Sequence, residues 1–249
     1  MTYCLALRLH DGLVFLADTR TNAGVDNVST YRKQHVFRPA PDRVFVLESA
    51  GNLATTHQVL DRIARDLTAE ESAVNLATVE HLFEAALYVG RLGRDVAAEH
   101  RAGLAPSGAD GTATFILGGR VGDAPADIFL VYPEGNYIRA SDERPFLQIG
   151  ETKYGKFMLE LAIEAGVDLV SAVKIALGSM MSTARANLSV GPPYDVAVLG
   201  AHAGTDLQEF RVEPDSPLLE RLREVWERNL LAAVAELPPI FEGDVRRID

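Results

Sequence analysis

Cysteine is nearly absent from this sequence: Cys4 is the only one in 249 residues. A single cysteine cannot form a disulfide within its own chain, so internal covalent cross-links are excluded. The six histidines are scattered along the chain and have no cysteine partners at the spacing of zinc ligands. We therefore expect no metal site.

Basic side chains are scarce relative to acidic ones. Lysine and arginine number 24 against 35 aspartate and glutamate residues, which gives a formal net charge of −11. Proteins that bind nucleic acid neutralise phosphates with a basic surface. We therefore expect no nucleic-acid partner.

Long apolar runs are missing as well. Stretches such as Phe115–Leu117 and Leu230–Ala235 are far shorter than the roughly 20 residues that cross a bilayer. The first residues, Met1–Leu5, lack the basic region, apolar core and cleavage site of an export signal. These absences predict a soluble, cytoplasmic protein that does not bind membranes.

What is present is the composition of a folded protein, with 47% apolar and 24% charged side chains. Residues Tyr3–His10 and Leu13–Ala17 are typical of strands and flank Asp11-Gly12, a hairpin turn pair. Residues Lys33–Arg38 and Arg43–Ser49 indicate a second pair of strands. The sequence therefore predicts four strands before any helix, with a polar loop between the two pairs.

Further along the chain, the apolar spacing alternates between the helical and strand periods. Helices are predicted from Asn52 to Leu67, from Leu76 to about His100, and over Lys153–Ala165, Val167–Asn187 and Ser216–Glu236; strands are predicted over Thr114–Gly118, Asp127–Tyr132, Tyr194–Leu199 and Leu207–Val212, with short ones near Tyr137 and Phe146. This order predicts an α+β fold, a four-layer αββα sandwich of two antiparallel sheets between helical layers, followed by a C-terminal helix.

Thr2 is the first candidate for chemistry. Threonine is small enough to permit removal of Met1, which leaves an α-amine and a hydroxyl on one residue. A free α-amine has a reference pKa of about 7.7–8.0, so at neutral pH part of it can accept the hydroxyl proton. Any chain can begin with Met-Thr, so this dipeptide alone does not indicate catalysis.

Asp18 and Lys33 add to the case for Thr2. Residues that face each other across a turn at Asp11-Gly12 have numbers that sum to about 23, which brings Asp18 near the chain start. An ammonium group beside a nucleophile lowers the pKa of the amine and stabilises a developing alkoxide. Asp18 would keep Lys33 charged. Taken singly, Asp18 is also a turn-capping residue and Lys33 a solvated strand start.

Gly51 lies where a predicted strand meets a predicted helix. Without a side chain, the backbone there can approach a substrate oxygen, so the Gly51 N–H is a candidate oxyanion donor. The alternative is an ordinary helix start that Ser49 or Asn52 caps, and the local pattern leaves both open. Cys4 is a weaker candidate nucleophile, because an internal thiol needs a nearby base; we interpret it as a small buried strand residue.

Together these residues resemble the proteasome β-subunit family of N-terminal nucleophile hydrolases. The resemblance rests on Thr2, Asp18, Arg20, Thr21–Gly24, Lys33 and Ala50-Gly51, and Met1–Cys4, Asp18–Asp26 and Asn187–Pro193 are similar to a bacterial branch of that family. It covers residues 2 to about 212. It implies a single β-subunit-like domain over 1–249, with a helical extension over about 213–249.

The resemblance also implies threonine peptidase chemistry. Thr2 would form an acyl-enzyme with a peptide amide after Met1 removal, supported by Asp18 and Lys33, with the Gly51 N–H as oxyanion donor. No cofactor or metal is required. The alternative is a proteasome-fold structural or assembly subunit with little or no peptidase activity.

Three features depart from the family pattern. Its members bring an aspartate and a serine to the amine of the nucleophile, whereas the matching stretch here contains Asn187 and Ser189, and Asn187 carries no charge. Glu151 stands where the family has a serine and is a candidate contact of the amine. The spacing from Thr2 to Lys33 is one residue shorter than usual, and we take Lys33 as the match.

An active site open to bulk solvent would make an unregulated peptidase, and the family solution is to face the sites into a shared cavity. We therefore expect a homo-oligomer, either a ring or a helical assembly, that acts on peptides or unfolded proteins, with an unidentified ATPase as a candidate partner. The apolar stripe of Ser216–Glu236, which includes Trp226, is a candidate contact surface. Packing of this helix on its own core is the alternative.

Overall fold

Two five-stranded antiparallel sheets face each other in the first of the chain's two structural units, Met1–Val212. A computed structural model describes residues 1–22, 28–69, 74–202 and 206–238. The second unit is Glu213–Asp249. Part of the stretch Thr21–Asp26, on which the family resemblance drew, lies outside the described residues.

The first sheet has the strand order β10-β1-β2-β11-β12. Its strands are β1 (Tyr3–Leu9), β2 (Gly12–Asp18), β10 (Phe146–Gly150), β11 (Tyr194–Gly200) and β12 (Leu207–Val212). The predicted hairpin of β1 and β2 is confirmed, but its register is not the predicted one. Cys4 pairs with Ala17, so facing residues sum to 21 and the two-residue turn is His10-Asp11.

The reason for the shifted turn is a close approach between strands. Gly12 belongs to β2, has a φ of 145°, and leaves no room for a Cβ against the Leu199 carbonyl oxygen of β11. The glycine is therefore required by its neighbouring strand rather than by the turn. Because of the new register, Asp18 lies closer to the chain start than the sequence predicted.

The second sheet has the order β5-β6-β7-β8-β9. Its strands are β5 (Gln34–Ala40), β6 (Arg43–Gly51), β7 (Ala113–Val121), β8 (Asp127–Val131) and β9 (Tyr137–Arg139). Two short strands, β3 (Arg20–Asn22) and β4 (Val28–Thr30), pair with each other. They replace part of the predicted polar loop, so six strands rather than four precede the first helix among the described residues.

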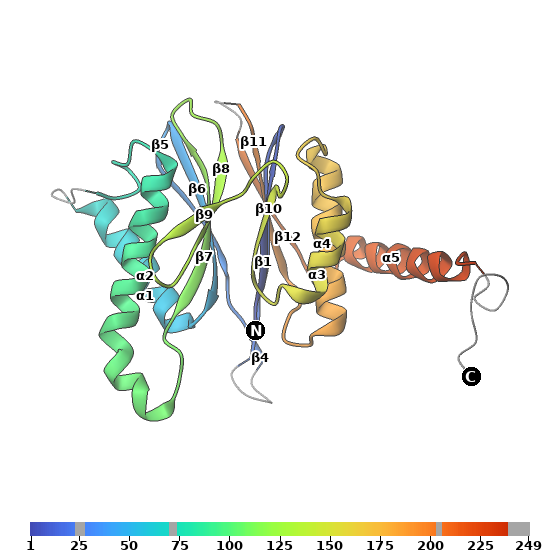
Figure 1. The fold of residues 1–249 in the computed structure, drawn as a ribbon, viewed down its shortest axis with the longest axis horizontal. Coiled ribbons are helices and arrows are strands. Elements are labelled where there is room, and N and C mark those ends of the chain that lie inside the picture. Colours follow the sequence, from blue (N-terminus) through green and yellow to red (C-terminus); the bar gives the residue numbers. More distant parts are fainter. Residues whose placement is uncertain (23–27, 70–73, 203–205, 239–249) are drawn as a thin grey trace, which may run out of the picture. The chain divides into compact units, whose positions relative to one another are not determined.

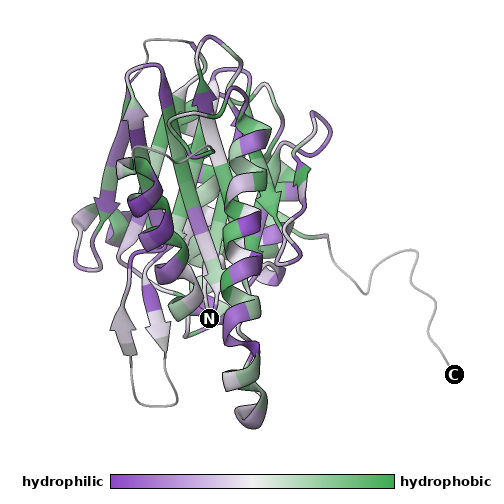
Figure 2. Cartoon of the chain, turned by 90° about the vertical axis from the view of Figure 1, so that its left-hand side faces the viewer, coloured by the Kyte–Doolittle hydropathy of each residue, from purple (hydrophilic) through white to green (hydrophobic). Residues whose placement is uncertain are grey.

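Helices cover the outer face of each sheet, as predicted (Figure 1). The helices of the first unit are α1 (Leu53–Thr68) and α2 (Leu82–Leu104), which adjoin β5–β9, and α3 (Lys153–Ala162) and α4 (Leu169–Ala186), which adjoin the other sheet; a short 3-10 helix, η1 (Ala105–Ser107), follows α2. The α+β sandwich of four layers is thus confirmed. Figure 2 shows the α1–α2 layer with hydrophilic outer surfaces over largely hydrophobic strands.

The second predicted helix begins later than the sequence indicates. Leu76 and Val79 are buried but lie in a turn, in which Asn75 Oδ1 accepts a hydrogen bond from the Ala77 N–H at 2.7 Å. Apolar residues of a turn that also face the core extend the helical pattern without being helical. The helix itself begins at Leu82.

Two apolar clusters form the core of the first unit. One, which includes Phe45, Leu47 and Phe115, lies between the β5–β9 sheet and helices α1 and α2. The other, which includes Phe15, Val46 and Ile116, lies between the two sheets. Because side chains alternate along a strand, β6 contributes to both clusters.

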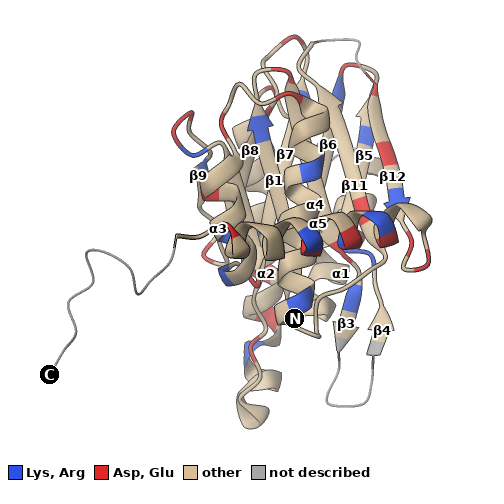
Figure 3. Ribbon diagram, turned by 90° about the vertical axis from the view of Figure 1, so that its right-hand side faces the viewer, with Lys and Arg blue, Asp and Glu red and all other residues tan. Residues whose placement is uncertain are grey.

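The second unit contains α5 (Pro217–Ala235). Ser216 caps this helix by accepting a hydrogen bond from the Leu219 N–H at 3.4 Å. Several of its apolar side chains are exposed, among them Leu230, Leu231 and Val234. Figure 3 shows positive and negative side chains interspersed on the helices and strands of that view rather than one uniform basic face.

Candidate active site

The start of β1 is fixed from one side by the end of β10. Tyr3 pairs with Gly150, and the Glu151 N–H donates a hydrogen bond to the Thr2 carbonyl oxygen at 2.7 Å. Gly150 packs directly against that carbonyl. Thr2 is therefore held by its backbone at the end of the sandwich where the chain begins (Figure 1).

Asp18, the last residue of β2, is fully buried beside this strand start. Its Oδ1 accepts hydrogen bonds from the Tyr3 N–H at 2.9 Å and from Lys33 Nζ at 2.7 Å. Its Oδ2 accepts one from the Gly191 N–H at 3.2 Å. A carboxylate with three donors, one of them charged, is anchored to two strands and a loop.

Lys33 is only 4% exposed and lies directly before β5. Besides Asp18, its Nζ donates to the Arg20 carbonyl oxygen at 2.6 Å and to the Met1 carbonyl oxygen at 3.4 Å. An ammonium group has three N–H donors and no acceptor. Three oxygens around Nζ are therefore the environment of a charged lysine rather than of a neutral amine.

Burial raises the pKa of the Asp18 carboxyl, and the adjacent Lys33 ammonium and the two backbone donors oppose this rise. The pKa of the Met1 ammonium is lowered, first by burial and then by the positive charge of Lys33, with Asp18 acting in the opposite direction. An amine at this end of β1 is thus in an environment that favours its neutral form.

Gly51 ends β6 and is exposed, with a φ of 113°. A Cβ there would lie 2.6 Å from the Thr112 carbonyl oxygen, so only glycine fits without strain. The next residue, Asn52, caps α1 by accepting a hydrogen bond from the Thr55 N–H at 3.1 Å. The capping alternative for this segment is therefore confirmed for Asn52, and the role of the Gly51 N–H as an oxyanion donor stays a prediction.

A groove of about 380 Å³ joins the two strand ends, with Gly51 on one side and Gly150 on the other. Since Gly150 contacts the Thr2 carbonyl, this groove runs from the candidate oxyanion donor to the residue beside Thr2. Gln148, Tyr132 and Thr152 also line it.

Glu151 and Asn187 are brought together by α4. Asn187 follows the last residue of this helix, and its Nδ2 donates to Glu151 Oε2 at 3.0 Å. Its Oδ1 accepts a hydrogen bond from the Ser189 N–H at 2.9 Å. Within the described part of the chain, Glu151 contacts Thr2 through its backbone N–H, while its carboxylate accepts the bond from Asn187.

Arg20 also belongs to this region, although the sequence alone assigned it no role in the chemistry. Its carbonyl accepts a hydrogen bond from Lys33, and its Nη1 donates to the Leu188 carbonyl oxygen at 3.0 Å. Its guanidinium also packs against Gly191. Arg20 thus ties the loop that follows α4 to the strands around Asp18; the Asp-x-Arg spacing was the available signal.

Cys4 does not take part in this arrangement. It is fully buried between the sheets, and its thiol faces the Ser49 carbonyl oxygen at 3.8 Å. Burial raises the pKa of the thiol well above its usual value. A thiol held neutral is a poor nucleophile.

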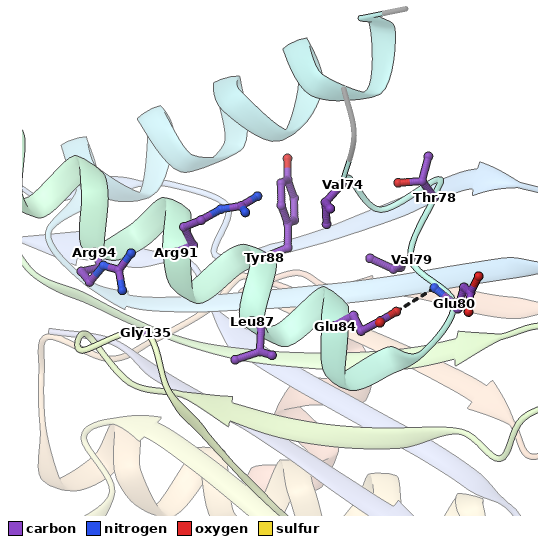
Figure 4. A pocket seen from close by; sticks show the side chains of 10 residues that line it. All are labelled: Val74, Thr78, Val79, Glu80, Glu84, Leu87, Tyr88, Arg91, Arg94 and Gly135. Carbon is purple, nitrogen blue, oxygen red and sulfur yellow. Dashed lines mark hydrogen bonds between the residues drawn. The ribbon is translucent and has the colours of Figure 1, made fainter. Parts of the chain in front are cut away.

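A second hollow, of about 550 Å³, lies away from the chain start, between α2 and the segment that precedes it (Figure 4). Its polar groups satisfy one another: Glu84 accepts a hydrogen bond from the Glu80 N–H at 2.8 Å, and the Arg91 guanidinium lies 5.6 Å from the centre of the Tyr88 ring. None of the described residues that line it is a serine, cysteine, histidine or lysine.

Two searches of the described part of the chain are negative. In residues 1–22, 28–69, 74–202 and 206–238, no group of three or more histidine, cysteine, aspartate or glutamate side chains is arranged to hold a metal ion. Over the same residues, no helix combines the length and the apolar character needed to cross a membrane.

The αββα sandwich, whose first strand begins beside a buried lysine–aspartate pair, is a proteasome-like fold of the N-terminal nucleophile hydrolase class. Comparison with family models and with curated protein sequences gives no match. Solved structures of Anbu proteins do match the chain along almost its whole length.

Anbu (ancestral beta-subunit) from Yersinia bercovieri is 38% identical, with a TM-score of 0.89 over 98% of this chain and 100% of that one. An Anbu (Gly-1) mutant from Hyphomicrobium sp. strain MC1 is 39% identical, with a TM-score of 0.88 and the same coverage. The helical assembly of the Anbu complex from Pseudomonas aeruginosa is 36% identical, with a TM-score of 0.90 over 98% of this chain and 100% of that one. The chain therefore belongs to the Anbu family.

Proposed function

We propose that this Anbu-family chain is a threonine-type peptidase subunit. After Met1 is removed, Thr2 Oγ attacks a peptide carbonyl, and the α-amine of Thr2 accepts the hydroxyl proton directly or through water. The Gly51 N–H stabilises the oxyanion. The amine then protonates the leaving amide nitrogen, and water hydrolyses the acyl-enzyme.

The observation that carries this proposal is the set of acceptors around Lys33. Two of them, Asp18 and the Arg20 carbonyl, belong to the folded core, whereas the third is the carbonyl of Met1. That carbonyl carbon is bonded to the Thr2 nitrogen. Removal of Met1 therefore frees one N–H donor of a buried ammonium group beside the new amine and its hydroxyl.

The electrostatics of the chain start support a neutral amine on Thr2. Burial and the charge of Lys33 already lower the pKa of the Met1 ammonium. The Thr2 nitrogen is bonded to the Met1 carbonyl carbon, whose oxygen accepts a hydrogen bond from Lys33 Nζ, so the positive charge of Lys33 also disfavours an ammonium group on Thr2. A lowered pKa keeps more of a general base in its neutral, proton-accepting form.

Glu151 and Asn187 support this site as positioning residues. The Glu151 N–H fixes the Thr2 carbonyl, and its carboxylate is engaged by the Asn187 amide. The same pairing favours the second candidate function, a structural or assembly subunit of low activity, because it occupies the Glu151 carboxylate that was the candidate contact of the α-amine. Turnover separates the two functions.

We also propose that the chain forms a homo-oligomer. A relative that is 36% identical is described as a helical assembly of the Anbu complex from Pseudomonas aeruginosa. Exposed apolar side chains such as Phe157 and Leu161 of α3, and Leu231 of α5, supply contact area of the kind that monomers rarely leave in water. A ring and a helix both satisfy this proposal.

Hydrolysis of a fluorogenic peptide amide by matched variants tests the function. Thr2→Ala should lose about a thousandfold or more of the turnover, while Thr2→Ser should keep a measurable part of it. Cys4→Ser is the control and should leave turnover unchanged, since Cys4 is fully buried and takes no part in the proposed steps. Equal turnover of Thr2→Ala and the unaltered protein would support the structural subunit instead.

A further inference from the structure

Glu48 is a carboxyl group in the middle of the sandwich that the proposed chemistry does not use. It lies on β6 and is fully buried. Its side chain shares a face with Val44, Val46 and Ala50, which pack between the two sheets. Neither of its carboxyl oxygens has a hydrogen-bond partner.

A second orphaned acceptor lies directly across the strand pair. Gln34 faces Glu48 in the register of β5 and β6, is 5% exposed, and its Oε1 has no hydrogen-bond donor. The Ser49 N–H donates to the Lys33 carbonyl oxygen at 3.0 Å. Gln34 and Glu48 therefore form the adjacent, non-hydrogen-bonded pair of the ladder, the kind in which side chains lie closest.

Two buried acceptor atoms that face each other without a donor are unfavourable, because burial removes their bonds to water and no bond within the protein replaces them. One proton on the carboxyl group removes both defects, since it turns one acceptor into an O–H donor. The backbone already places the two side chains for this bond, because the two residues are cross-strand neighbours.

The groups around Glu48 offer no cation to stabilise a carboxylate. Tyr3 and Cys4 of β1 are its titratable neighbours, and an ionised Glu48 would raise the pKa of both. On β7 the facing residue is the apolar Ile116. Gln34 lines a hollow of about 220 Å³ together with Arg32, Asp195 and Arg211, and there Asp195 engages the two arginines at 3.7 Å and 2.6 Å. Lys33 is engaged by Asp18.

Burial accordingly holds the pKa of Glu48 well above its usual value, opposed only by the field of the Leu16 N–H of β2. This direction agrees with the geometry, in which no charged group of the protein donates to the buried carboxyl oxygens.

We propose that Glu48 is kept as a neutral carboxylic acid whose O–H donates to Gln34 Oε1, and that this bond positions Lys33, the residue before Gln34. The bond ties β5 to β6 at the point where β5 begins. Lys33 directly precedes β5, so the position of this strand end determines whether the Lys33 side chain reaches Asp18. The part of the inference that concerns Lys33 rests on the proposed peptidase function; the protonated state of Glu48 does not.

A neutral Glu48 gives stability a definite pH dependence. Above about pH 4.3 the glutamate of the unfolded chain is ionised, while the folded chain keeps its proton. The folded state then binds more protons, so the free energy of unfolding falls as pH rises, until the pH passes the raised pKa of the folded state. Glu48→Gln keeps a donor for Gln34 Oε1 and removes this dependence.

Infrared difference spectra of the full chain test the protonated state directly. At neutral pH, the unaltered protein should show the carbonyl stretch of a protonated carboxyl group, and Glu48→Gln should lack it. Glu134→Gln, a change at an exposed glutamate, is the matched control and should keep the band. Identical spectra for the unaltered protein and Glu48→Gln would mean that Glu48 is ionised and would overturn the proposal; a turned Gln34 amide that donates to a carboxylate would give that result.

Urea unfolding from about pH 5 to about pH 9 provides the second measurement. The midpoint of the unaltered protein should fall relative to that of Glu48→Gln as pH rises, and Glu134→Gln should follow the unaltered protein. Parallel curves would contradict the inference. The pH profile of turnover tests the positioning role. Glu48→Gln should keep the turnover of the unaltered protein at neutral pH and should stay active to higher pH. The same loss of activity at alkaline pH in both proteins would contradict the positioning role, whereas the protonated state of Glu48 is tested by the infrared spectra.

Discussion

Lys33 and Arg32 are neighbours in the sequence, but their side chains have opposite surroundings. The Lys33 side chain is 5% exposed and paired with a buried carboxylate, whereas the Arg32 side chain is 61% exposed and lies 3.7 Å from Asp195. A buried charge beside the reacting atoms stabilises a transition state far more than a solvated one. The two residues are therefore a natural comparison.

We predict that Lys33→Ala lowers the turnover of a peptide amide by about a hundredfold or more, the scale of a lost transition-state stabiliser. Arg32→Ala should change turnover by much less. Because Lys33→Ala leaves Asp18 as an unpaired buried charge, the double variant Asp18→Asn/Lys33→Met keeps the test valid if the single variant does not fold. Equal turnover of the Arg32 and Lys33 variants would contradict the role of Lys33.

At the residue scale, the sequence contained most of the candidate site. Asp18 and Lys33 were chosen from their strand positions, and the structure brings both to the start of β1. Arg20 could not be assigned a function in the same way, because its partner carbonyl belongs to Leu188, which is 168 residues away in the sequence. Glu48 was part of a predicted strand, and its burial depends on how the second sheet is packed.

At the scale of single elements, the junction of β6 and α1 depends on Gly51, which takes a backbone conformation that other residues rarely adopt. We predict that Gly51→Ala costs about 1–3 kcal/mol of unfolding free energy, the scale of a strained backbone position. It should also lower turnover, because the Gly51 N–H would be displaced.

Gly166→Ala is the matched control for this change. Its φ is not positive and a Cβ there meets nothing within 4 Å, so its effect should stay within about 0.5 kcal/mol. Urea unfolding measures both variants. Equal losses of stability would show that the strain at Gly51 does not matter.

The types of the helices and strands and their order were largely predictable from the sequence. A helix or a strand buries one face, so its apolar residues recur with the helical or the strand period. The β12 bounds Leu207–Val212 were predicted as observed. The β1–β2 register was wrong, since a glycine that suits a turn also suits close strand contact, as at Gly12 beside Leu199. The short pair β3–β4 has too few residues to display a period.

The whole molecule is expected to be a large assembly of identical chains. Light scattering at micromolar concentration and moderate salt should give a particle mass well above the 27.0 kDa of one chain. Removal of the residues after Pro214 should lower that mass if α5 supplies contacts, since several of its apolar side chains are exposed. A monodisperse 27.0 kDa particle would contradict the assembly.

The most direct test of the central claim is the intact mass of the full chain after incubation with a peptide epoxyketone. This reagent forms two bonds to one residue, one to a terminal amine and one to the neighbouring hydroxyl, so it requires Thr2 to be free of Met1. We predict the mass of the chain without one methionine plus one reagent, and no adduct on Thr2→Ala. A chain that keeps Met1 and stays unlabelled, or an adduct on Cys4, would contradict Thr2 as the nucleophile.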